Sequence, residues 1–209
     1  MSLSHYLISF LLAYLVGSIP FGYVVGRLFF HKNLLILGSG NIGTTNTARV
    51  LGWRIGLVVM CLDILKGSLG ALMACLWGPL TVSQHWLYFA VGLGAILGHT
   101  YSFWIGFRGG KAVATSVGVL LIYNPLMFCL AFAIFGSTLF ITSMVSVASM
   151  VGFTLITLAS ALIQDWFLTL IAFSLTLFVF YRHRENIHRL KTGHERLIPF
   201  GLNYWRHQS

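Results

Sequence analysis

Charge is scarce in this sequence. Only 8% of the 209 residues are Asp, Glu, Lys or Arg and 57% are hydrophobic, whereas about 25% of a typical soluble domain is charged. This balance excludes a soluble globular protein. It also argues against nucleic-acid binding, because no sizeable soluble domain remains to carry that function.

Acidic residues are the scarcest charged type, with four against thirteen Lys and Arg: Asp63, Asp165, Glu185 and Glu195. Four carboxylates cannot readily supply a metal cage, and the eight histidines lack a compact ligand spacing. We therefore expect no metal and no other cofactor. The chain has no strong Ser–His–Asp signature. Its three cysteines lie in apolar segments without a C-x-x-C pair, which is typical of packing residues.

Long apolar segments fill most of the chain, and several exceed the roughly 18 residues needed to cross a bilayer core of about 30 Å. We place seven, at residues 3–27, 55–77, 85–107, 112–123, 126–142, 145–163 and 166–181. They predict an all-α integral membrane protein, a single domain over residues 1–209, built as a polytopic bundle of about seven transmembrane helices. Because 112–123 is short, five full crossings plus a re-entrant hairpin are the alternative.

The cations predict the orientation of these segments. Lys and Arg lie in the first loop, the third loop and the tail, and are absent from the second, fourth and sixth loops. The positive-inside bias then places the N-terminus outside and the C-terminus inside. The first segment lacks a basic n-region and is too long for a signal peptide, so we interpret it as a retained helix. Gly94 and Gly98 predict a close helix contact.

Three polar clusters interrupt the apolar segments, and the predicted topology puts all three on one face of the membrane. The first, residues 38–49, is a glycine-rich turn whose backbone N–H groups suit an anion. Its G-x-G-x-x-G spacing is no dinucleotide fingerprint, because no βαβ unit surrounds it. Ser39, Thr45 and Asn46 add short polar groups, and Arg49 adds a planar fork suited to phosphate. A capped loop between two spans is the alternative interpretation.

The second cluster, residues 108–111, places Gly109, Gly110 and Lys111 at the start of a helical segment. A helix N-terminus directs N–H groups outward and the lysine adds charge, so this pattern favours phosphate. A topogenic lysine that snorkels after a flexible turn would show the same pattern.

The third cluster begins the basic tail, where His183 and Asn186 are three residues apart and share a helix face. Glu185 and Arg189, four apart, are expected to pair. Glu195 is either a solvated charge or a tether. Within the second apolar segment, Asp63 is expected to form a structural ion pair, because ionisable groups at that depth are expensive, while the role of Lys66 stays open.

In this order, the clusters resemble the motifs of the bacterial acyl-phosphate:glycerol-3-phosphate acyltransferase family (PlsY). The matching stretches are Gly38-Ser39-Gly40-Asn41-x-Gly43-x-Thr45-Asn46-x-x-Arg49, Gly98-His99 through Phe107-x-Gly109-Gly110-Lys111-x-Val113-Ala114-Thr115, and Arg182-His183-x-x-Asn186-x-x-Arg189-Leu190 with Gly193 and Glu195. Asp63-x-x-Lys66-Gly67 also fits. Two departures are Ala112, where the family usually has glycine, and Ser102, where proline is common.

The resemblance implies acyl transfer from a fatty acyl phosphate to sn-glycerol 3-phosphate, at the cytosolic face of the bacterial cytoplasmic (inner) membrane. It implies that Ser39, Arg49, Lys111, His183 and Asn186 hold glycerol phosphate. It further implies that the acyl-phosphate head group binds at Thr45, Asn46, Gly109 and Gly110, together with Ser146. Asn41, Asp63, Lys66 and Glu195 are expected to be structural. Partners are the two substrates and membrane lipids, with no obligate protein partner.

Two questions stay open at this stage. The hydroxyl proton goes either to His183 or to a substrate phosphate oxygen, and we favour the phosphate because Lys111 and Arg49 surround the histidine with positive charge. A transporter or exchanger of organic phosphates needs a similar cationic site, and so is the main alternative function. The sequence shows no inverted repeat of the kind that often marks transporters.

Overall fold

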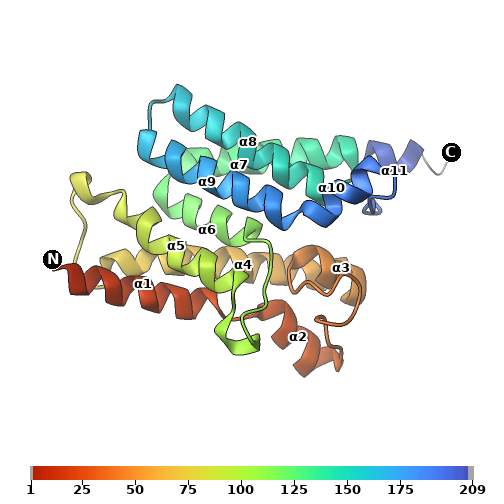
Figure 1. Cartoon of the computed structure of the whole chain (residues 1–209), viewed down its shortest axis with the longest axis horizontal. Coiled ribbons are helices and arrows are strands. Elements are labelled where there is room, and N and C mark those ends of the chain that lie inside the picture. The colour runs from red at the N-terminus through yellow and green to blue at the C-terminus, as the bar shows by residue number, and fades with distance from the viewer. Residues whose placement is uncertain (1, 207–209) are drawn as a thin grey trace. The chain divides into compact units, whose positions relative to one another are not determined.

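The computed structural model describes residues 2–206, and within this range it contains helices and turns but no β-strand. An isolated backbone bridge joins Ser102 to Arg108. The prediction of an all-α protein is confirmed (Figure 1).

The α-helices are α1 (Leu3–Gly17), α2 (Phe21–Phe30), α3 (Thr44–Leu51), α4 (Trp53–Leu72), α5 (Leu87–Thr100), α6 (Val113–Tyr123), α7 (Pro125–Thr142), α8 (Val145–Leu162), α9 (Trp166–Arg182), α10 (Arg184–Lys191) and α11 (Leu202–Arg206). Single 3₁₀ turns occur at η1 (Met73–Cys75), η2 (Val82–Gln84) and η3 (Phe103–Ile105).

Within residues 2–206, four stretches are long and apolar enough to cross a bilayer: Leu3–Phe30, Trp53–Cys75, Pro125–Thr142 and Val145–Leu162. A fifth results if α9 and α10, bent by 62° at their junction, are taken as one span. Two predicted segments form shorter helices: α5 has 14 residues and α6 has 11. At 1.5 Å per residue these extend roughly 21 Å and 17 Å, less than the core of about 30 Å. The count of seven crossings is not confirmed and stays a prediction.

Two boundaries differ from the sequence prediction. The first apolar segment is broken between Gly17 and Phe21, where Pro20 has no N–H to continue a helical ladder. The loop predicted for residues 28–54 contains α3, which composition did not reveal because its residues are mostly polar. This helix is stabilised by packing on α4, since a Cβ added at Gly56 would lie 2.5 Å from the Cβ of Ala48.

The chain divides into two compact units, Met1–Pro125 and Leu126–Ser209, here called the N-terminal and C-terminal units. In the N-terminal unit α4 packs against α1, α3, α5 and α6, and α1 packs against α5. Backbones approach closely at glycines: a Cβ at Gly98 would lie 2.2 Å from the Tyr14 carbonyl oxygen, and one at Gly94 would lie 2.5 Å from that of Phe10. The predicted contact through Gly94 and Gly98 is confirmed.

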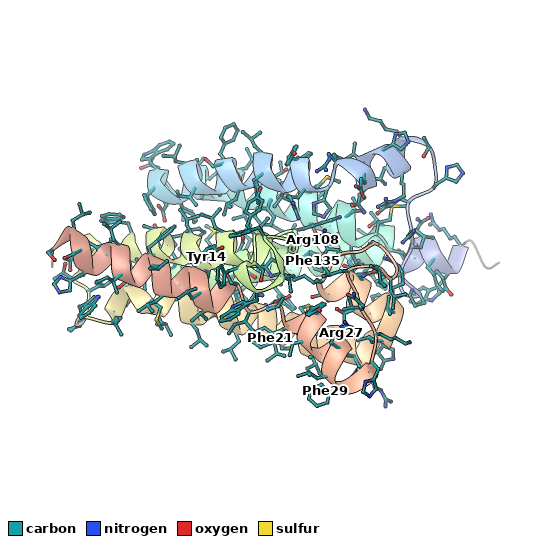
Figure 2. The ribbon with its side chains drawn as sticks, turned by 60° about the horizontal axis from the view of Figure 1, so that its bottom comes forward. Tyr14, Phe21, Arg27, Phe29, Arg108 and Phe135 are labelled. Carbon is teal, nitrogen blue, oxygen red and sulfur yellow. The ribbon has the colours of Figure 1, made fainter. Side chains whose placement is uncertain are left out.

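A buried ion pair lies inside α4. The Lys66 Nζ is 2.6 Å from the Asp63 Oδ1, and the two side chains are 1% and 2% exposed. The ammonium also donates to the Ile19 carbonyl at 2.8 Å and lies 5.5 Å from the ring centroid of Phe21, the residue labelled in Figure 2 that begins α2. The expected structural pair of Asp63 is therefore present. Lys66, whose role the sequence left open, also supplies a donor at the break between α1 and α2.

In the C-terminal unit α8 packs against α9 with two hydroxyl contacts. The hydroxyl oxygens of Thr157 and Thr176 lie 3.0 Å apart, and the Thr169 hydroxyl donates to the Ser160 hydroxyl oxygen at 3.0 Å. Such contacts are typical of helix pairs in membranes. Helix α11 packs onto the α7–α8 turn, where the Ser143 hydroxyl accepts from the Tyr204 N–H at 3.0 Å.

Candidate active site

The first cluster is organised by the side chain of Asn46. This side chain lies on α3 and is 2% exposed. Its Oδ1 accepts from the Ser39 N–H at 2.8 Å, and its Nδ2 donates to the carbonyls of Asn41 at 2.8 Å and Leu37 at 3.0 Å. These bonds engage both ends of the amide within the loop. These bonds show that Asn46 holds the loop together, and the substrate role that the family resemblance implies for it stays a prediction.

Asn41 connects the first and second clusters. Its Oδ1 accepts from the Gly43 N–H at 2.8 Å, beside the start of α3, and its Nδ2 lies 3.5 Å from the Gly109 carbonyl oxygen. These two residues are 68 positions apart in the sequence. The structural role expected for Asn41 agrees with this geometry, and within the N-terminal unit two of the three predicted clusters lie together.

The predicted anion ligands of the first cluster lie around Asn46. Arg49 is exposed on the last turn of α3, with its Nη1 3.4 Å from the Asn46 Oδ1. Ser39 is exposed and Thr45 is half-buried in the first turn of α3. A planar guanidinium, a hydroxyl and a helix N-terminus in one loop are groups that bind phosphate oxygens well.

The second cluster lies against the end of α5. The Gly110 N–H donates to the His99 carbonyl at 3.0 Å, and a Cβ at Gly109 would lie 2.2 Å from that same oxygen. The sequence expected the Gly110 amide to point outward toward an anion. In the structure this amide already has a partner within the fold, because the turn folds back on α5. Lys111 is half-buried and follows directly.

The third cluster surrounds the junction of α9 and α10. His183 is 3% exposed at this junction, and its Nδ1 lies 2.8 Å from the Val179 carbonyl oxygen. A carbonyl can only accept, so Nδ1 carries a hydrogen, and in the neutral form of the ring Nε2 would be the acceptor nitrogen.

Glu195 binds the remaining predicted residues of the C-terminal unit. Its Oε1 accepts from the Ser146 hydroxyl at 2.7 Å and from the Asn186 Nδ2 at 2.6 Å, and its Oε2 is 2.9 Å from the Arg189 Nε. Glu195 is therefore the tether that the sequence proposed as one of two readings. Arg189, which the sequence paired with Glu185, forms its ion pair with Glu195 because the tail folds back onto α10.

These contacts shift the titration of Glu195. Burial of the carboxylate opposes its ionisation, but the hydrogen bonds from Asn186, Ser146 and Arg189, with the Arg189 charge, outweigh burial and hold the pKa of Glu195 below its ordinary value. The ionised carboxylate thus stabilises the fold and fixes the side chains of Ser146 and Asn186.

Sequence reasoning missed one residue at this site, His99, although it stood inside a quoted motif. A lone histidine at the end of an apolar helix carries little signal. Its importance comes from the turn that folds back onto it, 10 residues later in the chain.

Helices of bilayer length, combined with loops rich in cations, hydroxyls and glycine, define a multi-pass membrane protein suited to phosphorylated ligands. The sequence model of the family described as glycerol-3-phosphate acyltransferase matches residues 7–193. The chain belongs to this family and is an acyltransferase.

Curated relatives and solved structures agree. The glycerol-3-phosphate acyltransferase of Lactiplantibacillus plantarum is 53% identical over 97% of this chain and 96% of the relative, and that of Enterococcus faecalis is 48% identical over 92% and 91%. The crystal structure of PlsY, an integral membrane glycerol 3-phosphate acyltransferase, in its glycerol 3-phosphate form is 36% identical, covers 92% of this chain and 95% of that one, and gives a TM-score of 0.84. Its lysophosphatidic acid form gives 0.81 at 35% identity. These relatives do not support the transporter alternative.

The role of Asn46 is tested by Asn46→Ala. Removal of the amide leaves partly buried loop carbonyls without their donor, at up to about 1–3 kcal/mol for such a group. We expect faster amide hydrogen exchange over residues 34–46 together with loss of turnover. Thr45→Ala, one position away, should lower turnover without changing exchange. A weaker substrate affinity of Asn46→Ala with unchanged exchange would instead make Asn46 a direct ligand.

The tether predicts a pH dependence of stability. Because the folded-state pKa of Glu195 is lowered, its contribution is complete above the ordinary value of 4.5 and is lost as pH falls through the lowered pKa. In detergent at pH 7, Glu195→Gln should unfold more easily than wild type by about 1–3 kcal/mol, as for hydrogen bonds to a charged group. The difference should shrink only below pH 4.5. Glu185→Gln changes an exposed carboxylate on α10 and should match wild type. A stability difference between Glu195→Gln and wild type that is already lost near pH 6 would refute the assignment.

Proposed function

We propose that this acyltransferase moves a fatty acyl group from an acyl phosphate to the 1-hydroxyl of sn-glycerol 3-phosphate, giving lysophosphatidate and inorganic phosphate for phospholipid synthesis. One observation carries the acceptor and product: a homologue of matching fold has been solved in glycerol 3-phosphate and lysophosphatidic acid forms. The acyl-phosphate donor rests on the motifs of the chain and on the chemistry of its loops.

The chemistry of an acyl phosphate suits these loops. It is a mixed anhydride with a good leaving group, so transfer needs no covalent enzyme intermediate. Two phosphorylated substrates repel one another, and cations with N–H and O–H donors offset that repulsion. Catalysis then comes chiefly from positioning and electrostatic stabilisation.

For the individual residues, we propose that Ser39, Arg49 and Lys111 of the N-terminal unit hold glycerol phosphate. His183 and Asn186 of the C-terminal unit are assigned to the same substrate by the family motifs. Glu195 orients the Asn186 amide, since its Oε1 takes one of the two amide hydrogens.

The acyl-phosphate head group is assigned to Thr45, the Gly109–Gly110 turn and Ser146. Ser146 donates its one hydroxyl hydrogen to Glu195 in this structure, so binding of a phosphate oxygen by Ser146 requires the hydroxyl to turn away from Glu195. Asn46 moves from this set to a positioning role, for the reasons given by its hydrogen bonds.

A substrate phosphate oxygen remains the proposed acceptor of the hydroxyl proton. We propose that His183 instead orients glycerol phosphate through its Nε2. The proton on Nδ1, held by the Val179 carbonyl, fixes this orientation.

The proposed topology follows the distribution of Lys and Arg. The N-terminus lies outside and the tail inside, with about seven crossings, and the polar clusters face the cytosol from the cytoplasmic membrane. The short helices α5 and α6 cross together with the 3₁₀ turns and loops that extend them.

The donor is tested with purified protein. With glycerol 3-phosphate as acceptor, we expect lysophosphatidate and inorganic phosphate to form in equal amounts from acyl phosphate, and no product from an acyl thioester of the same chain length. If the thioester gave product at an equal rate, the proposal that acyl phosphate is the donor would be wrong. Reconstituted vesicles that take up glycerol 3-phosphate without acylating it would contradict the enzymatic function.

The cationic ligands are tested by Arg49→Ala and Lys111→Ala. Each removes charge stabilisation of the transition state, and we expect turnover to fall by about 100-fold or more. Arg54→Ala and Lys191→Ala remove the same charge from exposed positions and should retain near-normal turnover. Normal turnover in a folded Arg49→Ala or Lys111→Ala variant would remove that residue from the site.

A further inference from the structure

The proposed mechanism gives no role to His99, a histidine that is 3% exposed in the last turn of α5. Its backbone carbonyl accepts the Gly110 N–H at 3.0 Å. Buried histidines in apolar helices are expensive unless their ring nitrogens have polar surroundings, so we expect polar contacts around this ring.

One side of the imidazole lies directly against Gly110. A Cβ added to Gly110 would lie 1.9 Å from the His99 Nε2 and 2.6 Å from its Cε1. Gly110 does not adopt the left-handed backbone conformation that favours glycine. The space taken by the imidazole is therefore the reason that this position has no side chain.

The other side of the ring faces the buried ion pair of α4. The His99 Nδ1 lies 3.6 Å from the Asp63 Oδ1, an electrostatic contact slightly longer than a hydrogen bond. Asp63 is held by Lys66 at 2.6 Å, and Lys66 by the Ile19 carbonyl at 2.8 Å. Removing one member of such a buried pair is costly. Lys66 therefore holds the Asp63 carboxylate in place beside the His99 ring.

Other contacts fasten the same turn to the end of α5. The Ser102 N–H donates to the Arg108 carbonyl at 3.2 Å, and the Ser102 hydroxyl donates to the Ser18 carbonyl. The Tyr14 hydroxyl, on the residue labelled in Figure 2, donates to the Tyr101 carbonyl at 2.8 Å. These bonds fix residues 101–108, while His99 is the side chain that seats Gly110.

We propose that His99 is a positioning residue for acyl transfer: its imidazole, oriented by Asp63 and Lys66, seats the Gly109–Gly110 turn and so places the acyl-phosphate head group. This inference rests on the proposed assignment of that turn to acyl phosphate. Gly110 is then a glycine because it must accommodate the ring, in contrast to a phosphate loop in which glycine lets backbone amides approach the ligand.

The chain offers a matched pair of glycines to test this seat. A Cβ at Gly110 would collide with the His99 side chain, whereas a Cβ at Gly109 would collide with the backbone oxygens of His99 and Thr100, at 2.2 Å and 2.4 Å. Truncating the His99 side chain relieves only the first collision. Gly110→Ala and Gly109→Ala are therefore compared in wild-type and His99→Ala backgrounds.

Both glycine variants should lose activity, by up to about 100-fold in kcat/KM for acyl phosphate, as for a misplacement of about 1 Å. His99→Ala should raise the KM for acyl phosphate by about tenfold while the KM for glycerol 3-phosphate changes by less than about twofold, a split that general loosening of the fold does not produce. His99→Ala/Gly110→Ala should recover to the level of His99→Ala alone, and His99→Ala/Gly109→Ala should not recover.

The role of the ion pair is measured with Asp63→Asn/Lys66→Met, which removes both charges and leaves no unpaired ion in the apolar interior. We expect a lowered thermal unfolding midpoint, because the Ile19 carbonyl loses its donor, and in the folded variant a raised KM for acyl phosphate with an unchanged KM for glycerol 3-phosphate. If His99→Ala does not fold, His99→Asn replaces it, because the shorter side chain keeps a polar atom toward Asp63 and still makes room for a Cβ at position 110.

The proposed role of His99 would be overturned if His99→Ala did not rescue Gly110→Ala. It would also be overturned if His99→Ala changed the KM for both substrates equally. A wild-type KM for acyl phosphate in Asp63→Asn/Lys66→Met would overturn the part assigned to the ion pair. These outcomes are separate from the proposed function, which fails if the wild-type protein does not use acyl phosphate. If the wild-type protein does not use acyl phosphate, the role of His99 in placing the donor is overturned as well. Recovery of protein stability in His99→Ala/Gly110→Ala would then show only that the imidazole packs against Gly110.

Discussion

A bilayer core provides no water to bind backbone groups, so each break in a helix has to be satisfied by the chain itself. The break between α1 and α2 shows this most clearly. The Ile19 carbonyl accepts from the Lys66 ammonium, and the Ser18 carbonyl accepts from the Ser102 hydroxyl. The charge on Lys66 is balanced in turn by Asp63. The buried Lys66 ammonium thus supplies the hydrogen-bond donor that the break requires. Its ion pair with Asp63 forms a polar centre in the N-terminal unit.

Three of the four acidic side chains in this protein serve the fold. Asp63 pairs with Lys66, Asp165 accepts from the Leu168 N–H at 2.9 Å as the N-cap of α9, and Glu195 ties the tail to α8 and α10. The substrates proposed here are anions, and a carboxylate directed at them would repel them. Engaging these three acids in structural contacts limits the negative charge near the loops, while Glu195 still acts on the site through Ser146 and Asn186.

Sequence patterns predicted the features that depend on local composition. Apolar runs predicted α4, α7, α8 and α9, and the cost of an ion in an apolar segment predicted the pairing of Asp63. The features that were missed depend on contacts distant in sequence. The function of Asn46 follows from carbonyls that only the folded loop brings to it, and Gly110 gains its meaning from a ring supplied by α5. The break at Pro20 was readable, since proline disfavours a helical residue before it, but the apolar run concealed it.

Ala112 shows how the fold accommodates a departure from the family pattern. It precedes α6 with a φ of 67°, in the left-handed region that glycine adopts without penalty. For another residue that conformation costs roughly 1–2 kcal/mol. The methyl group is fully buried, at 0% exposure, and burying one such group returns about 0.8 kcal/mol. Alanine also loses less backbone entropy than glycine on folding, by about 0.5–1 kcal/mol. These terms nearly cancel, so alanine can replace the usual glycine beside Lys111 without moving the turn that His99 seats.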